Sequence, residues 1–238
     1  MKITLIGYGT MGKEVEAAAL SRGHEIILII DKDNADDLDK EIFKQSDVAI
    51  EFTTPETAFE NIEKCINRGV PVVSGTTGWT DRLEEAQKLA VSEGGCLLYA
   101  SNFSLGVNIL FNLNRKLAEI MNEQEAYSVK LEEIHHARKK DAPSGTAKSL
   151  AEDIISKCKK YGAWSAAESA SGGEIGIKSV REGDVPGTHR VEWKSDIDDI
   201  IIEHRAHNRR GFALGAVFAA EFIQNRQGVF TMKDLLGF

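Results

Sequence analysis

The fold is decided by the stretch Lys2-Ile-Thr-Leu-Ile-Gly7-Tyr-Gly9-Thr-Met-Gly12-Lys-Glu-Val-Glu-Ala-Ala-Ala-Leu20. A short apolar run leads into three glycines with the spacing Gly-x-Gly-x-x-Gly, and a series of strong helix formers follows. This order predicts a β-strand, a tight turn and a helix whose first backbone N–H groups can hold a pyrophosphate. A purely structural glycine turn is the alternative, but the flanking strand and helix favour a dinucleotide-binding domain.

The next apolar run, Glu25 to Ile30, ends at Asp31 and Lys32, and these two residues bear on the choice of nucleotide. Asp31 lies 19 residues beyond Gly12 (31 − 12), where a carboxylate can bind ribose hydroxyls. A carboxylate repels a 2′-phosphate and a neighbouring ammonium attracts it, so the pair is compatible with NADH, NADPH or both. Lys32 can equally be an ordinary solvated lysine.

Composition excludes several classes of protein. The chain has 238 residues, with 37 acidic against 29 basic side chains and a formal net charge of -8, which opposes binding to nucleic acid or anionic lipid. We find no signal peptide and no run of about 18 apolar residues that could span a bilayer. Cys65, Cys96 and Cys158 lack metal-binding spacing and are expected to be reduced thiols. We expect a cytoplasmic protein without nucleic-acid or membrane partners.

Strands and helices alternate as far as Ala100, which predicts right-handed βαβ units and a Rossmann-like parallel sheet of the α/β class. The acidic segment 33–39 is expected to be exposed chain. The further strands are expected over 47–52, 70–74 and 96–100, and the helices over 55–68 and 81–92.

The pattern changes after residue 104, where consecutive strands predict an α+β domain with a mixed sheet, used for substrate binding and oligomerisation. We expect helices over 107–121 and 146–160, strands over 127–134, 176–180 and 200–204, and a linker over 163–173. An apolar helix over 212–225 returns the chain to the first domain. The predicted domains are residues 1–105 with 211–238 for the dinucleotide, and residues 106–210 for the substrate.

Two short segments follow predicted strands directly, Gly75-Thr-Thr-Gly78 and Ala100-Ser-Asn-Phe103. The carboxyl ends of parallel strands are where open α/β sheets bind ligands, so these small and polar residues are expected to line the nicotinamide site. As isolated tetrapeptides, either segment could also be a simple turn.

The segment from Glu133 to Ala147 reverses the overall acidic character of the chain. Five cationic donors occur within six residues, which suggests a bound anion; they are His135, His136, Arg138, Lys139 and Lys140. A basic solvated loop and a structural histidine are the alternatives. We expect no metal site, because adjacent histidines on a strand point to opposite faces and no third ligand is evident.

Pro143 and Ser144 then open the next predicted helix, with Ser144 or Asp141 suited to capping it. The exposed N–H groups of Gly145 and Thr146 could hold a carboxylate at this positive helix end.

At these residues the sequence resembles the 4-hydroxy-tetrahydrodipicolinate reductase family, formerly called dihydrodipicolinate reductase. The family pattern E-x-H-H-x-x-K-x-D-A-P-S-G-T-A matches Glu133 to Ala147 at every specified position. The similarity extends over nearly the whole chain, and includes residues 52–53, 75–78, 100–108, 181–189 and 228–236.

The resemblance implies roles for individual residues. His135 and Lys139 would be the catalytic pair, and His136, Gly145 and Thr146 would bind the substrate together with Ser144 at the helix start. The implied nucleotide contacts are Gly7, Tyr8, Gly9, Thr10, Met11, Gly12, Asp31, Lys32, Phe52, Thr53, Gly75, Thr76, Thr77, Ala100, Ser101, Asn102, Phe103, Arg209 and Phe212.

The resemblance also implies an activity: NADH- or NADPH-dependent reduction of a small cyclic dicarboxylate, 4-hydroxy-tetrahydrodipicolinate, to tetrahydrodipicolinate with loss of water, in the diaminopimelate route to lysine. His135 or Lys139 would be the general acid. A homotetramer assembled through the second domain's sheet is implied as well. Two alternatives are another Rossmann-type dehydrogenase of the aspartate-derived pathways and a nonenzymatic nucleotide sensor. The candidates among these dehydrogenases are of the aspartate-semialdehyde and homoserine types. An aspartate-semialdehyde dehydrogenase needs a nucleophilic cysteine, which residues 101–104 lack.

Overall fold

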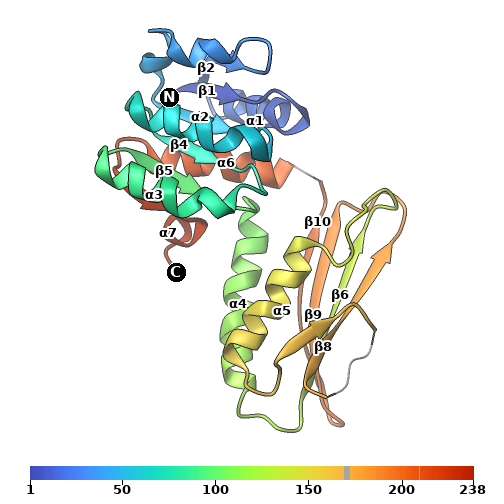
Figure 1. The fold of residues 1–238 in the computed structure, drawn as a ribbon. Helices are drawn as coiled ribbons and strands as arrows, with labels where there is room; N and C mark the ends of the chain where they lie inside the picture. Colours follow the sequence, from blue (N-terminus) through green and yellow to red (C-terminus); the bar gives the residue numbers. More distant parts are fainter. Residues whose placement is uncertain (169–171, 209) are drawn as a thin grey trace. The chain divides into compact units, whose positions relative to one another are not determined.

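Two units make up the chain in the computed structural model, which describes residues 1–168, 172–208 and 210–238 (Figure 1). Unit 1 comprises Met1–Leu105 and Arg210–Phe238, and unit 2 comprises Gly106–Arg209. Unit 2 is thus inserted between strand β5 and helix α6 of unit 1. The second segment of unit 1 begins at Arg210, one residue before the start at 211 that the sequence predicts, because helix α6 begins at Arg210.

Unit 1 contains a parallel sheet of six strands in the order β11-β5-β4-β3-β1-β2. The parallel sheet and five of its strands were predicted from sequence, whereas β11 was not. Strand β2 lies on one side of β1, and β3, β4 and β5 follow on the other side. The strand order therefore reverses between β1 and β3, and a ligand-binding crevice is expected beyond the carboxyl ends of these two strands. The strands are β1 (Lys2–Ile6), β2 (Glu25–Ile30), β3 (Val48–Glu51), β4 (Val72–Ser74), β5 (Cys96–Tyr99) and β11 (Gly228–Phe230).

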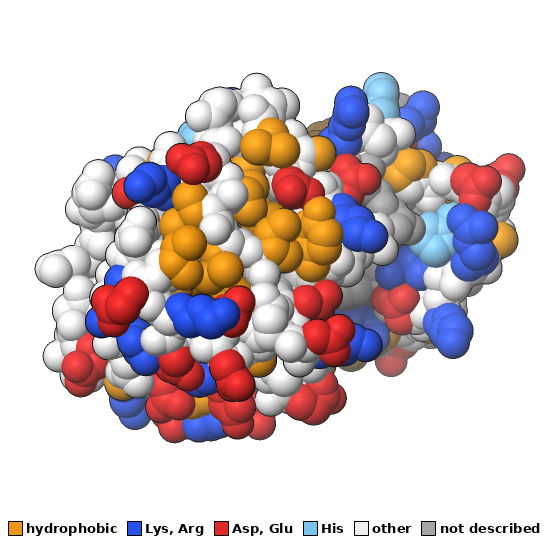
Figure 2. Space-filling view, turned by 90° about the horizontal axis from the view of Figure 1, so that it is seen from above, with side chains coloured by type: hydrophobic (Ala, Val, Ile, Leu, Met, Phe, Trp, Pro, Cys, Tyr) orange, Lys and Arg blue, Asp and Glu red, His pale blue; other side chains and the backbone are white. Residues whose placement is uncertain are grey.

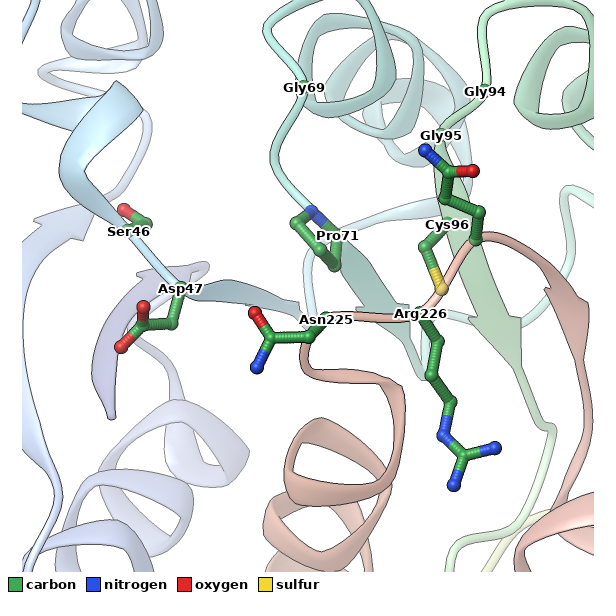
Figure 3. A pocket seen from close by; sticks show the side chains of 10 residues that line it. Ser46, Asp47, Gly69, Pro71, Gly94, Gly95, Cys96, Asn225 and Arg226 are labelled. Carbon is green, nitrogen blue, oxygen red and sulfur yellow. The ribbon is translucent and has the colours of Figure 1, made fainter.

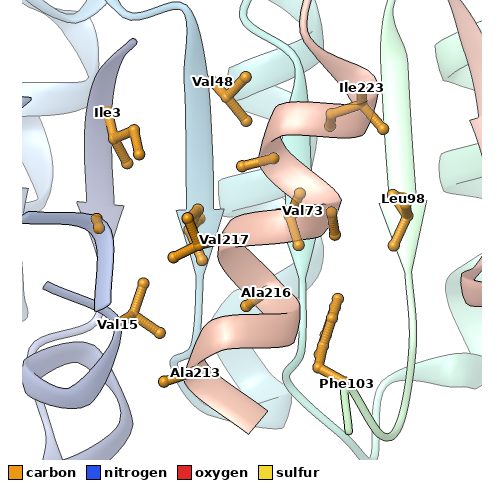
Figure 4. Close-up of a cluster of buried hydrophobic side chains, with 14 of the residues drawn as sticks. Ile3, Val15, Val48, Val73, Leu98, Phe103, Ala213, Ala216, Val217 and Ile223 are labelled. Atoms are coloured by element: carbon orange, nitrogen blue, oxygen red, sulfur yellow. The ribbon is translucent and has the colours of Figure 1, made fainter. Parts of the chain in front are cut away.

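Helices cover both faces of this sheet. Helices α1 and α6 form one apolar cluster with it, and α2 and α3 form the other. Figure 4 shows α6 laid along the sheet, with Ala213, Ala216 and Val217 against the strand side chains. The helices are α1 (Thr10–Ser21), α2 (Pro55–Asn67), α3 (Leu83–Ser92), α6 (Arg210–Ile223) and α7 (Met232–Leu236), with the 3₁₀ turns η1 (Ala35–Asp39), η2 (Phe43–Gln45) and η3 (Thr80–Arg82).

Unit 2 contains a mixed sheet of five strands in the order β10-β9-β6-β8-β7, in which β6 pairs antiparallel with β9 and parallel with β8. Trp193 lies fully buried between this sheet and helices α4 and α5, edge-on to Tyr161. The elements are α4 (Leu105–Met121), β6 (Ser128–His135), α5 (Gly145–Lys157), β7 (Ala163–Ser165), β8 (Glu174–Arg181), β9 (Gly187–Lys194) and β10 (Asp199–Ala206).

Three local expectations differ from the structure. Segment 33–39 is not simply exposed chain, because η1 buries Leu38 against unit 1. The predicted linker 163–173 begins with strand β7, and its residues 169–171 lie outside the described residues. Strand β9 was not predicted, although Arg190 and Glu192, an ion pair of 3.0 Å, alternate there with the buried Val191 and Trp193.

The surface carries both signs of charge. Figure 2 shows acidic and basic side chains interspersed over the face in view, around one area of hydrophobic side chains. Within the described ranges, every helix is too short or too polar to cross a membrane.

Candidate functional site

The three glycines of the first turn serve different purposes. Gly7 has φ +92°, and a Cβ there would lie 2.0 Å from the Phe52 carbonyl oxygen. A Cβ on Gly12 would lie 2.3 Å from the Gly7 carbonyl oxygen. At Gly9, no atom of the described residues lies within 4 Å of the added Cβ. Gly7 and Gly12 therefore let β1, β3 and α1 approach closely, whereas Gly9 leaves open space for a ligand.

This open space lies at the amino end of α1. Gly9 is the N-cap, no side chain in the described part of the chain caps it, and the first turn contains no acidic residue. The helix N-terminus therefore keeps its N–H groups and partial positive charge for an external anion. These features fit a nucleotide pyrophosphate.

Asp31 lies exposed just beyond β2, as the sequence predicts. The backbone N–H of Lys32 donates to its Oδ1 at 2.9 Å, and its own N–H donates to Asn34 Oδ1 at 2.7 Å. The carboxylate is thereby held in place at the end of the strand, while its surface stays open to a ribose.

A buried carboxylate that sequence reasoning missed organises the next two loops. Glu51, the last residue of β3, is 0% exposed and accepts hydrogen bonds from the Thr53 N–H at 2.9 Å and the Thr76 hydroxyl at 2.7 Å. It also accepts from the Thr53 hydroxyl and from the Ser74 hydroxyl, the latter at 2.6 Å. The structure thus ties together Thr53 and Thr76, two of the predicted nucleotide contacts.

Other predicted nucleotide contacts have a packing role. The Phe52 and Phe103 rings meet edge to face at 5.8 Å between centroids, and a Cβ on Gly75 would lie 2.1 Å from the Phe52 ring. Arg209 lies outside the described residues. Of the remaining contacts, Lys32, Thr10, Thr77 and Ser101 are exposed, and Tyr8, Met11, Ala100, Asn102 and Phe212 are half-buried.

A cavity of about 550 Å³ lies at the opposite edge of the unit 1 sheet, around the amino ends of the strands (Figure 3). Asp47, Pro71, Cys96 and Arg226 contribute to its lining. It is therefore separate from the glycine turn and from the loops that follow β3 and β4.

In unit 2, a row of polar side chains crosses the sheet. Glu133 on β6 lies opposite His189 on β9 and Ser179 on β8, and His189 in turn lies opposite His204 on β10. His135 is two residues beyond Glu133 on the same buried face of β6. His136 follows the end of the strand and is half-buried, so the two adjacent histidines have different surroundings.

Glu133 is the centre of this cluster. It is 0% exposed and accepts hydrogen bonds from the Ser144 N–H at 3.0 and 3.1 Å, the Ser179 hydroxyl at 2.8 Å and Arg181 Nη2 at 2.9 Å. His135 Nδ1 lies 3.3 Å from its Oε2. Burial raises the pKa of Glu133, but the hydrogen bonds outweigh burial and hold that pKa well below its ordinary value.

His189 lies beside the pair. Its ring meets the His135 ring edge to face at 5.0 Å between centroids, and its Nε2 lies 3.3 Å from the Ser144 hydroxyl. Burial, together with the neighbouring His135, lowers the pKa of His189 to about 3, so the ring is neutral near pH 7. Gly187 makes room for the cluster, because a Cβ there would lie 3.2 Å from His135 Nε2.

The helix start agrees with the sequence in its cap but not in the place of Pro143, which precedes the N-cap instead of lying in the first turn. Ser144 is the N-cap of α5, and its hydroxyl accepts from the Ala147 N–H at 3.3 Å. Gly145 is exposed, and the described residues leave open space where its Cβ would be, while Thr146 is half-buried. The helix start therefore has an open side at Gly145.

Two predicted cations form ion pairs beside this helix start. Lys139 Nζ lies 2.8 Å from Asp141 Oδ1, and Arg138 Nη2 lies 2.9 Å from Asp184 Oδ1. Both side chains of the Arg138–Asp184 pair are largely exposed, whereas the Lys139 side chain is 23% exposed. The Lys139 ammonium also contributes to lowering the pKa of His189, which places it beside the histidine cluster.

The described residues include one group of three potential metal ligands, which contains His135 but not His136. Glu133, His135 and His189 offer ligand atoms within 4.8 Å of one another. The Arg181 guanidinium, 2.9 Å from Glu133, already occupies that carboxylate and would repel a divalent cation. The cluster is therefore better suited to holding protons than to holding a metal ion.

Together these features define a class of protein: a nucleotide-dependent oxidoreductase with a Rossmann-like unit and a second unit that contains a buried histidine cluster beside a helix start. Two family models, described as dihydrodipicolinate reductase N-terminus and C-terminus, match residues 1–103 and 106–236. The chain belongs to the dihydrodipicolinate reductase family, whose members are NAD(P)H-dependent oxidoreductases of the diaminopimelate and lysine pathway.

Relatives agree with this assignment. The 4-hydroxy-tetrahydrodipicolinate reductase of Christiangramia forsetii is 50% identical over 99% of this chain and 98% of its own length. The enzyme of the same name from Neisseria gonorrhoeae strain NCCP11945 is 35% identical over 93% of this chain and 84% of its own length. The resemblance inferred from residues 133–147 is thus confirmed, and the other dehydrogenases and the sensor are set aside.

Solved structures agree on the fold. The dipicolinate-bound dihydrodipicolinate reductase from Paenisporosarcina sp. TG-14 has a TM-score of 0.81 at 24% identity and covers 97% of both chains. GenD2, a protein from gentamicin A biosynthesis solved in complex with NAD, has a TM-score of 0.59 at 11% identity and covers 99% of this chain and 90% of its own.

Proposed function

We propose that unit 1 binds NADH or NADPH and that unit 2 binds 4-hydroxy-tetrahydrodipicolinate, which the protein reduces with loss of water. The observation that carries the proposal is the buried Glu133–His135 pair, beside a capped helix start whose Gly145 faces open space. A cyclic dicarboxylate needs both an anion-binding helix end and cationic side chains, and this part of unit 2 offers both.

The nucleotide assignment is supported by the uncapped N-terminus of α1 and by the space at Gly9. In the proposed complex, the turn from Gly7 to Gly12 holds the pyrophosphate and Asp31 holds the ribose. Thr53 and Thr76, both bonded to Glu51, then line the crevice beyond β3 and β4. Because Lys32 lies exposed next to Asp31, the site is expected to accept either nucleotide.

The reduced nucleotide, when bound, supplies a hydride to the substrate ring, and the protein must supply one proton as water leaves. We assign His135 as the general acid: an N–H bond of its imidazolium breaks, and the proton moves to the substrate. Lys139 balances the negative charge of the substrate, and His136, Ser144, Gly145 and Thr146 hold its carboxylates.

The test follows the consumption of NADH and of NADPH with the cyclic dicarboxylate. We expect His135→Gln and Lys139→Ala to lower turnover by about two orders of magnitude or more while nucleotide binding is retained. Arg138→Ala is the matched control, because Arg138 is an exposed cation in the same loop. Unchanged turnover in both site variants would contradict the proposed roles.

The choice of nucleotide has its own test. Asp31→Asn is expected to weaken NADH relative to NADPH, because it removes a ribose-binding carboxylate that also repels a 2′-phosphate. Lys32→Ala is expected to act in the opposite direction. If neither variant changes the ratio of the KM for NADH to the KM for NADPH, these residues do not determine the preference for one nucleotide.

The proposal includes a homotetramer assembled through the face of the unit 2 sheet that lies away from α4 and α5. Ile201, 43% exposed, lies on this face beside Glu192, which pairs with Lys130 at 3.1 Å. Apolar and paired charged groups together are typical of protein interfaces. Sedimentation velocity should show a tetramer that Ile201→Lys weakens, and a wild-type monomer at micromolar concentration would contradict the assembly.

A further inference from the structure

We propose that Glu133 is a positioning residue for the reaction: its carboxylate orients His135 and stabilises the imidazolium, and it also fixes the substrate-binding start of α5. The inference rests on the proposed role of His135 as general acid. Glu133 is expected not to touch the substrate, because it is 0% exposed.

The first step of the argument concerns the imidazole. His135 Nδ1 is buried and lies 3.3 Å from Glu133 Oε2, whereas the side chain as a whole keeps 9% of its surface exposed. The contact has the distance of an ion pair but not the geometry of a hydrogen bond, so the carboxylate stabilises a positive charge on the ring, and Nε2 is the nitrogen left to exchange a proton with the substrate. After the transfer, the neutral ring keeps its Nδ1 proton beside Glu133.

The second step concerns the helix start. Both oxygens of Glu133 accept from the Ser144 N–H, and Ser144 is the N-cap of α5. The same carboxylate thus fixes the acid and the residues proposed to bind the substrate carboxylate. A shift of this one side chain would disturb both at once.

The third step is the charge balance around His135. The anion in contact with it is Glu133 on β6, and in the following loop Asp141 pairs with Lys139. The other titratable or cationic groups facing this cluster are Arg181 on β8, His189 on β9 and His204 on β10. If Glu133 became neutral, Arg181 would lose its partner and these groups would disfavour a charged His135.

The test compares Glu133→Gln with Glu132→Gln. Glu132 is the matched control, because it is the adjacent carboxylate on the opposite face of β6, where it pairs with Lys178 at 3.3 Å. For Glu133→Gln, we expect the alkaline limb of kcat against pH to move down by about 1 pH unit or more, and kcat near pH 7 to fall about tenfold or more. Glu132→Gln should leave both unchanged, and both variants should bind NADH like the wild type.

A second variant and a direct measurement complete the design. Glu133→Asp keeps the charge but shortens the side chain, so the alkaline limb should stay within about 0.5 pH unit of wild type while KM for the dicarboxylate rises. NMR spectra, with His135 assigned by comparison with His135→Gln, should show its imidazole signals displaced in Glu133→Gln and unchanged in Glu132→Gln.

The outcomes separate the two hypotheses. A wild-type protein that does not oxidise either nucleotide with the dicarboxylate would overturn the proposed function itself. An active wild type with an unshifted alkaline limb in Glu133→Gln would overturn the role of Glu133 alone. If Glu133→Gln does not fold, Glu133→Asp decides: unchanged kcat and KM, or an alkaline limb displaced by a full unit, would overturn the inference.

Discussion

Alanine at Gly7 and at Gly9 should affect different properties of the protein, although the two glycines are two residues apart. At Gly7, a Cβ would lie 2.0 Å from the Phe52 carbonyl oxygen, and the backbone has φ +92°. At Gly9, φ is -74°, and the described residues leave the Cβ without any neighbour within 4 Å. The first substitution should impair the fold, and the second should impair nucleotide binding.

The magnitudes follow from these contacts. Overpacking typically costs about 1–3 kcal/mol, and the positive φ adds about 1–2 kcal/mol for a residue with a Cβ, so Gly7→Ala should destabilise unit 1 by about 2–5 kcal/mol. That corresponds to a fall in Tm of roughly 4–20 °C for a chain of this size. Gly9→Ala should change the free energy of unfolding by less than about 1 kcal/mol, because its backbone suits alanine.

The assays are thermal unfolding by circular dichroism and NADH titration by fluorescence. We expect Gly9→Ala to raise the Kd for NADH about tenfold or more, which corresponds to about 1.4 kcal/mol, since its methyl group occupies the space proposed for the pyrophosphate. The reasoning is refuted if Gly7→Ala melts like the wild type, or if Gly9→Ala binds NADH with unchanged affinity.

Three further outcomes test the packing and protonation of buried groups. Trp193→Ala should destabilise the protein by about 3–5 kcal/mol in urea unfolding, because it empties the centre of unit 2; a loss below about 1 kcal/mol would contradict this. The pKa of His189 is about 3 in the folded protein and near 6.5 when unfolded, so stability should fall by up to about 1.4 kcal/mol per pH unit as the pH drops from 6 to 4. His189→Asn should make that acid slope shallower, and an equal slope would show that His189 is not buried and neutral. Burial raises the pKa values of Cys65 and Cys96, and Cys158 is buried as well, so a thiol reagent should label these cysteines only after unfolding.

Most of the architecture of unit 1 could be predicted from sequence, because its signals are local. The strand, glycine turn and helix of residues 2–20 follow one another without a break, and buried parallel strands appear as continuous apolar runs. The cap of α5 was narrowed to Ser144 or Asp141, because both residue types cap helices and both lie just before the helix; the structure shows Ser144. In each case, the residues that determine the element are neighbours in the chain.

Strand β9 and the partners of the site could not be predicted in the same way. His189 and Arg181 reach Glu133 and His135 only through the register of β9 and β8 with β6, which brings together residues more than 40 positions apart. One signal was available: Glu133 precedes His135 by two residues, so on a strand they must share a face. That spacing identifies Glu133 as a neighbour of the acid, but not the direction of its carboxylate.

Both candidate sites share one physical device, a fully buried carboxylate at or near the carboxyl end of a strand. Glu51 follows this design in unit 1 and Glu133 in unit 2, and each accepts hydrogen bonds from a backbone N–H beyond its own strand and from a serine hydroxyl of the neighbouring strand. A buried charge without such donors would be strongly destabilising, so each carboxylate requires its loops to adopt one arrangement. Loops fixed in this way need little rearrangement when a nucleotide or dicarboxylate binds, which is the condition for efficient hydride and proton transfer. Burying Glu51 and Glu133 is thus unfavourable by itself, but their hydrogen bonds order the segments where ligands are proposed to bind.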